Sequence, residues 1–204
     1  MLRDYNVPAA PVETEMEVKK SRFIARVYRA ETREQAMAWL DVARKDYPDA
    51  RHHCWAYLLG DPHSPRSVAM SDDGEPGGTA GKPILNVLQH KDVGDIMLIV
   101  IRYFGGIKLG AGGLVRAYSA SAQQGMDGLE TELFIRKQVI SVTLDFQHEN
   151  VIRHWLNQHD AAVIDNTYAQ QVTLKCQLAV VDLDEFKAFC EGIGGVCSGL
   201  DDCP

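Results

Sequence analysis

The amino-acid sequence predicts an α+β protein built from two domains, and three observations lead to this prediction. An unbroken apolar run at Ile96–Ile101 has the β-branched composition of a strand buried on both faces. Residues 135–204 show the element order β-α-β-β-α-β, which is the split, ferredoxin-like arrangement. The hydrophobic pattern changes between Glu132 and Arg136, so we predict domains at residues 1–134 and 135–204.

The first domain is predicted to begin with a loose arm of residues 1–12, which contains two prolines. Strands follow at residues 13–20 and 22–28, where the composition favours extended structure. Thr32 and Gln35 have the spacing of a capping box and predict a helix that ends near Pro48.

The middle of the first domain alternates regular elements with glycine-rich segments. Residues 53–59 read as a strand, and a glycine- and proline-rich loop follows over residues 60–82. A short helix at residues 84–89 precedes the buried Ile96 strand. Beyond the next glycine loop, apolar residues at helical spacing predict a long helix that ends near Thr131.

The second domain begins with a strand that has one solvated face, because Ile140, Val142, Leu144 and Phe146 alternate with polar residues. The remaining predicted elements are a helix around residues 151–156, strands at 162–168 and 172–180, a helix at 183–190 and a last strand at 196–200.

Five glycines separate the buried strand from the long helix: Gly105, Gly106, Gly110, Gly112 and Gly113. A strand, a glycine loop and a helix N-terminus leave backbone N–H groups free at the positive end of the helix dipole. Such a site suits a phosphate or carboxylate. The candidate anion-binding residues are Lys82, Arg102, Lys108, Gly110, Gly112, Gly113 and Arg116. The alternative is that these glycines only turn a tight corner against a neighbouring surface.

An acidic loop, Ser71–Pro83, forms the second dense motif. The carboxylates of Asp72, Asp73 and Glu75 could bind a divalent cation or position a water molecule. Alternatively, the loop is a solvated turn in which aspartates bond their own backbone near Gly74. The segment is not a P-loop, because a proline replaces the Ser or Thr that ligates magnesium.

Composition limits the possible classes of function. The net charge is −7, with −2 in the first 135 residues and −5 in the rest. This negative charge argues against a protein that coats nucleic acid non-specifically, but it allows a local basic patch in the first domain. Five scattered cysteines without a Cys-x-x-Cys pair argue for reduced thiols rather than zinc or disulfides. The sequence shows neither a signal segment nor a membrane span, so we expect a cytoplasmic protein without membrane partners.

Three segments in this order resemble the IMPACT family, and in particular its bacterial, YigZ-like branch: residues 51–57, 71–83 and 100–118. The motif residues are His52, His53, Asp72, Asp73, Gly74, Glu75, Gly105 and Gly106. The resemblance implies a first domain of the ribosomal-protein type, a two-layer α/β sandwich with helices on one face of a sheet. It implies a second domain similar to the C-terminal modules of elongation factor G. Eukaryotic relatives restrain a starvation-activated kinase of translation initiation, a circuit that is not expected in bacteria.

We expect a non-catalytic binding protein that acts in translation or its stress regulation. Its partner would be the ribosome, structured RNA or a translation-related protein, and no catalytic residue, metal or cofactor is assigned. Tyr103 and Phe104 could stack on bases or pack in the core. The alternative is a phosphate- or nucleotide-binding enzyme that uses the glycine loop and the acidic loop, with His52 or His53 as a base.

Overall fold

The computed structural model describes residues 4–202, which divide into two compact units. The first unit comprises Asp4–Phe134, and the second begins at Ile135. Both units combine antiparallel sheets with helices, so the predicted two-domain α+β class is confirmed. Cys203 lies outside the described residues.

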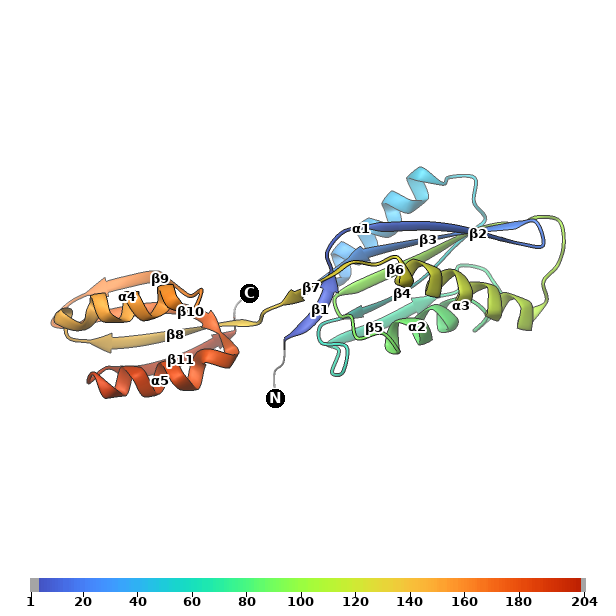
Figure 1. Ribbon diagram of the computed structural model, residues 1–204. Helices are drawn as coiled ribbons and strands as arrows, with labels where there is room; N and C mark the ends of the chain where they lie inside the picture. The colour runs from blue at the N-terminus through green and yellow to red at the C-terminus, as the bar shows by residue number, and fades with distance from the viewer. Residues whose placement is uncertain (1–3, 203–204) are drawn as a thin grey trace. The chain divides into compact units, whose positions relative to one another are not determined.

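The first unit is organised around a five-stranded antiparallel sheet (Figure 1). The strand order across the sheet is β2 (Val12–Val18), β3 (Ser21–Arg29), β6 (Ile96–Tyr103), β4 (His52–Leu59) and β5 (Ser67–Ser71). The apolar β6 occupies the centre, where seven of its eight residues are buried, as a strand covered on both faces requires.

Helices cover both faces of this sheet. Helix α1 (Arg33–Asp46) packs on one face against Ile24, Met97 and their neighbours. Helices α2 (Gly81–Gln89) and α3 (Ala111–Asp127) pack on the other. The expectation of two layers with helices on one face is therefore corrected. Strands β3, β4 and β6 carry apolar side chains on both faces, so helices must pack on each face to bury them.

Three short strands were not predicted. Strand β1 (Tyr5–Pro8) pairs with β7 (Thr131–Phe134), and Tyr5 and Val7 are buried, so this part of the chain is not a loose arm. Strand β5 lies within the segment predicted as an irregular loop and forms the edge of the sheet beside β4.

The second unit has the sheet order β11-β8-β10-β9, which is the order of the ferredoxin-like fold. Its elements are β8 (Lys137–Leu144), α4 (Glu149–Gln158), β9 (Ala162–Tyr168), β10 (Val172–Ala179), α5 (Leu183–Gly192) and β11 (Val196–Asp202), with short 3-10 turns at Phe146–His148 and Val180–Asp182. Both helices cover one face, where Trp155 and Phe186 pack on alternate residues of β8 and β10.

Candidate anion-binding site at the start of α3

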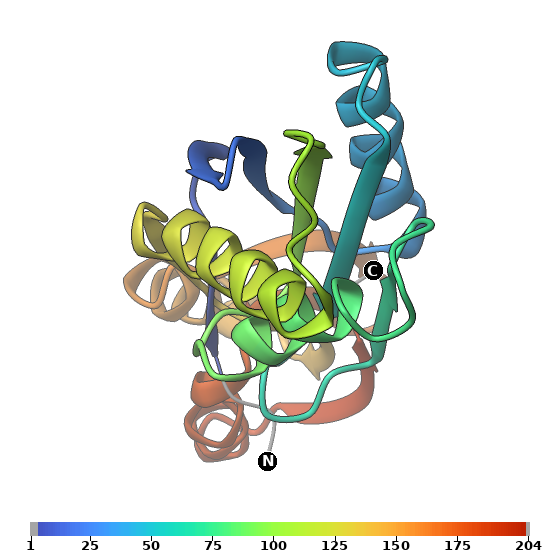
Figure 2. The same ribbon diagram turned by 90° about the vertical axis from the view of Figure 1, so that its right-hand side faces the viewer.

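The loop from β6 to α3 is fixed at one end by a close backbone approach. A Cβ at Gly105 would lie 2.0 Å from the carbonyl carbon of Lys20, so only glycine fits there. The Gly105 N–H donates to Ser21 Oγ at 3.1 Å. The loop therefore rests on the turn between β2 and β3, and both segments lie at the end of the unit that faces the viewer in Figure 2.

No described side chain caps the first turn of α3. Its N-cap residue, Gly110, has φ 72° and ψ 164°, a region open almost only to glycine, and offers no side chain to the amides. The first helical hydrogen bond runs from Leu114 N–H to the Gly110 carbonyl. Within residues 4–202, the N–H groups of Ala111, Gly112 and Gly113 donate to no protein group. The positive end of the helix dipole therefore faces solvent.

Four exposed cations surround this turn. Lys19 and Lys20 form the two-residue turn between β2 and β3, with φ 48° and 64°, a conformation in which Asn-Gly is usual. Lys108 and Arg116 come from the loop and from the second turn of α3. In the described part of the chain, none of the four forms an ion pair.

Two of these cations line a groove of about 370 Å³ between β2 and α3. Lys19 stands on one side and Arg116 on the other. The remaining lining residues are Met16, Val18, Leu109, Gly113, Ala117 and Ala120. The groove thus has a mostly apolar floor and positive edges. We call Lys19, Lys20, Lys108, Arg116 and the first three amides of α3 the basic rim.

The structure corrects the expectation for Arg102, which is only 6% exposed. Its Nη1 donates to Glu75 Oε1 at 2.5 Å, and its guanidinium lies against the rings of Phe23 and Phe104. Arg102 follows Leu98 and Val100 in the alternation of β6, so its side chain points under α2 and α3. It is not part of the basic rim.

Lys82 is exposed in the first turn of α2 and lies outside the residues that line the groove. Three N–H groups at and just before the start of this helix are already occupied. Asp72 accepts hydrogen bonds from the N–H groups of Gly78, Ala80 and Gly81 at 2.8–2.9 Å. Burial acts to raise the pKa of Asp72, but these three bonds outweigh it and lower the pKa. Asp72 is therefore the cap of α2.

The other two carboxylates of the acidic loop are also engaged. Asp73 Oδ2 accepts from the His53 N–H at 2.6 Å, and the Asp73 carbonyl accepts from His52 Nδ1 at 2.8 Å. Gly74 has φ 86° and sits beside the His52 ring. Glu75 is buried and bonds Arg102. The motif residues predicted at the acidic loop and at the two histidines thus lie together.

Glu75 connects this loop to α3. Besides Arg102, its Oε1 accepts from the Tyr118 hydroxyl at 3.0 Å, and His52 Nε2 lies 3.9 Å away. The Cys54 thiol lies 3.3 Å from the same hydroxyl. Burial raises the pKa of Cys54 to about 12 and also raises that of Tyr118, so both groups stay protonated. The cluster is an anchor for the loop, without an activated nucleophile.

His52 and His53 point to opposite faces of the sheet. His52 pairs with Arg102 on the face of α2 and α3, and His53 pairs with Ile101 on the face of α1. Desolvation lowers the pKa of the buried His53, whose Nε2 has no hydrogen-bond partner among the described residues. The two rings therefore do not form one site.

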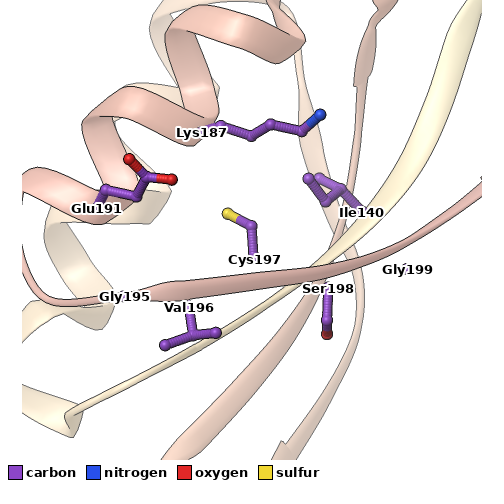
Figure 3. Close-up of a pocket in the computed structure, with 8 residues that line it drawn as sticks. All are labelled: Ile140, Lys187, Glu191, Gly195, Val196, Cys197, Ser198 and Gly199. Atoms are coloured by element: carbon purple, nitrogen blue, oxygen red, sulfur yellow. The ribbon is translucent and has the colours of Figure 1, made fainter.

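The second unit contains a shallow hollow of about 480 Å³ at β11 and α5 (Figure 3). Lys187 and Glu191 of α5 lie across it from Cys197. Burial raises the pKa of Cys197, so the thiol is not activated. None of the predicted site residues lines this hollow.

Known proteins match nearly the whole length of the chain. The model of the Impact N-terminal domain matches residues 19–126, and a domain of unknown function (DUF1949) matches residues 142–189. The IMPACT family member YigZ of Escherichia coli (strain K12) is 38% identical over 187 residues, which are 92% of each chain. The chain belongs to the IMPACT family.

A further relative and a solved structure support this assignment. YvyE of Bacillus subtilis (strain 168) is 32% identical over 202 residues, 99% of this chain and 91% of its own. A crystal structure described as that of a hypothetical protein is 36% identical, has a TM-score of 0.75 and covers 100% of this chain and 99% of its own. The names of YigZ and YvyE state family membership and no activity.

Sequence reasoning missed Lys19 and Lys20. The sequence did contain a hairpin signal, because only two residues separate the strand that ends at Val18 from the strand that begins at Ser21. Lys-Lys is an unusual pair for such a turn, and the strands were predicted to continue through it.

No helix among the described residues has the length and apolar character needed to cross a membrane.

Proposed function

We propose that the protein binds phosphate groups of structured RNA at the basic rim and acts in translation or its stress regulation. The observation that carries the proposal lies at one helix start, where four cations form no ion pair and three amides no hydrogen bond with other described residues. Such groups contact the phosphate backbone and position a protein on RNA without reading its sequence.

The charge distribution supports a local contact rather than a general one. The chain as a whole carries −7, so most of its surface repels a polyanion. No carboxylate of the described side chains forms an ion pair with a cation of the rim. We therefore assign the contact to the first unit, and we leave the acidic second unit to a protein partner.

The place in translation rests on the family and not on geometry. A cytoplasmic location belongs to the same proposal. It agrees with the thiol state of Cys54, Cys176, Cys190 and Cys197, none of which forms a disulfide in the described residues.

The enzyme alternative has less support. Its acidic loop would need a free carboxylate or an activated nucleophile. Asp72, Asp73 and Glu75 all bond to neighbouring groups of the chain, and Cys54 and Tyr118 stay protonated.

The proposal is tested by measuring the affinity for a fluorescent RNA hairpin across a range of salt concentrations. Each of Lys19→Ala, Lys108→Ala and Arg116→Ala should weaken binding and lower the slope of log K against log salt by about 1, the value expected for one phosphate contact. Lys45→Ala is the matched control, because Lys45 is also exposed but lies on α1, over the opposite face of the sheet. Equal effects of rim and control variants, or no binding at all, would contradict the proposal.

A further inference from the structure

Phe104 is an exposed aromatic ring beside the basic rim. It follows the last residue of β6, and 49% of its surface is accessible. The preceding Tyr103 packs instead against the core on the α1 face, under the guanidinium of Arg22. Of these two neighbouring aromatic residues, only Phe104 offers a largely solvated surface.

The position of Phe104 is fixed from two sides. On one side the Arg102 guanidinium lies 5.6 Å from the ring centroid, and it is held by the buried Glu75. On the other side Gly105 is locked against the Lys20 backbone. A ring held in this way loses little conformational entropy when it stacks on a ligand.

The surroundings of the ring indicate the chemistry of its ligand. Lys20 contacts the residue next to Phe104, and Lys108 follows in the same loop, so the ligand carries negative charge. The cation behind the ring withdraws electron density from it and makes it a better partner for an electron-rich face. A nucleobase attached to a phosphate backbone has both features.

We propose that Phe104 stacks on an unpaired base of the RNA whose phosphates bind at the basic rim. The inference rests on the proposed function and makes it more specific: the ligand is RNA with a bulge or loop base next to a helical stem, rather than continuous duplex. Bases inside a stem are covered by their neighbours, whereas an unpaired base offers its face to an aromatic side chain.

The test compares a blunt RNA duplex with the same duplex carrying one unpaired 2-aminopurine, whose fluorescence is quenched when it stacks. The wild type should bind the bulged RNA more tightly, by roughly five- to a hundred-fold, and quench its fluorescence. Phe104→Leu should lose both effects while it keeps the affinity for the duplex. Phe104→Trp should retain them.

Ile107→Ala is the matched control, because Ile107 is a similarly exposed apolar residue of the same loop that cannot stack. Thermal melting checks that each variant is folded. Equal binding of both RNAs by the wild type, or an unchanged preference in Phe104→Leu, would overturn this inference and leave the proposed function standing. Failure of the wild type to bind either RNA would overturn both.

Discussion

Two turns of the first unit lead from a strand into a helix and are rich in glycine, yet they end differently. The turn before α2 carries Asp72, which accepts hydrogen bonds from the N–H groups of Ala80 and Gly81 at the helix start and from that of Gly78 before it. The turn before α3 ends in Gly110 and leaves its amides open, with four cations around them. Glycine content therefore does not identify a ligand site. What matters is whether the chain satisfies its own N–H groups.

The largest expected effect comes from Glu75, which holds the turn before α2 in place. Glu75→Ala leaves the guanidinium of Arg102 buried without its partner and should lower the free energy of unfolding by about 3–5 kcal/mol. Urea denaturation monitored by tryptophan fluorescence measures this loss. Glu130→Ala, at an exposed position, is the control. Similar losses in the two variants would mean that the acidic loop is held by other contacts.

The cap of α2 should produce the next largest effect. Asp72→Ala removes the acceptor of three charge-assisted bonds and should lower the free energy of unfolding by about 1.5–3 kcal/mol at neutral pH. Asp72→Asn, which keeps one acceptor oxygen, should lose less. Urea unfolding of the three proteins ranks them.

The same substitution has a pH dependence whose sign follows from the pKa shift. The pKa of Asp72 is lower in the folded state than its ordinary value of 3.8. The stabilisation by the ionised Asp72 carboxylate is therefore fully present above pH 3.8 and is lost as the pH falls through the pKa of the folded state. The difference between wild type and Asp72→Ala should shrink from pH 7 to pH 3. A constant difference would show that the charge of Asp72 is unimportant.

The comparison can be sharpened by giving α3 the carboxylate that α2 already has. Gly112→Asp places a negative charge in the first turn of α3, four residues before Arg116. It should stabilise the fold by about 0.3–1 kcal/mol relative to Gly112→Asn, because it complements the helix dipole. It should also weaken RNA binding. Urea unfolding and RNA titration of the two variants provide the measurement, and unchanged RNA binding by Gly112→Asp would remove α3 from the proposed site.

The smallest effect concerns His53, whose backbone N–H anchors the acidic loop through Asp73. Desolvation lowers the pKa of the buried ring in the folded state, so the unfolded chain takes up the proton more readily. The contribution of the neutral His53 ring to the free energy of unfolding should be fully present above pH 6.5 and decline below it. The decline should be shallower in His53→Gln. Parallel pH profiles of unfolding would contradict this assignment.

Part of the fold could be predicted because its signals are local. The apolar run of β6, the helical spacing of α3 and the alternation in β8 each mark an element without knowledge of its neighbours. Strands β1, β5 and β7 were missed. They have four or five residues each, and their pairing partners, rather than their own composition, stabilise them as strands.

The sequence by itself determined the order of the longer elements, the family motifs and the glycine turn before α3. Only the tertiary structure decided which charges remain free there. Arg102 is neutralised by Glu75 and leaves the rim, and Lys19 and Lys20 join it from a distant turn. The physical reason is that an anion site depends on unsatisfied groups. Whether a charge is satisfied depends on contacts between residues far apart in the chain.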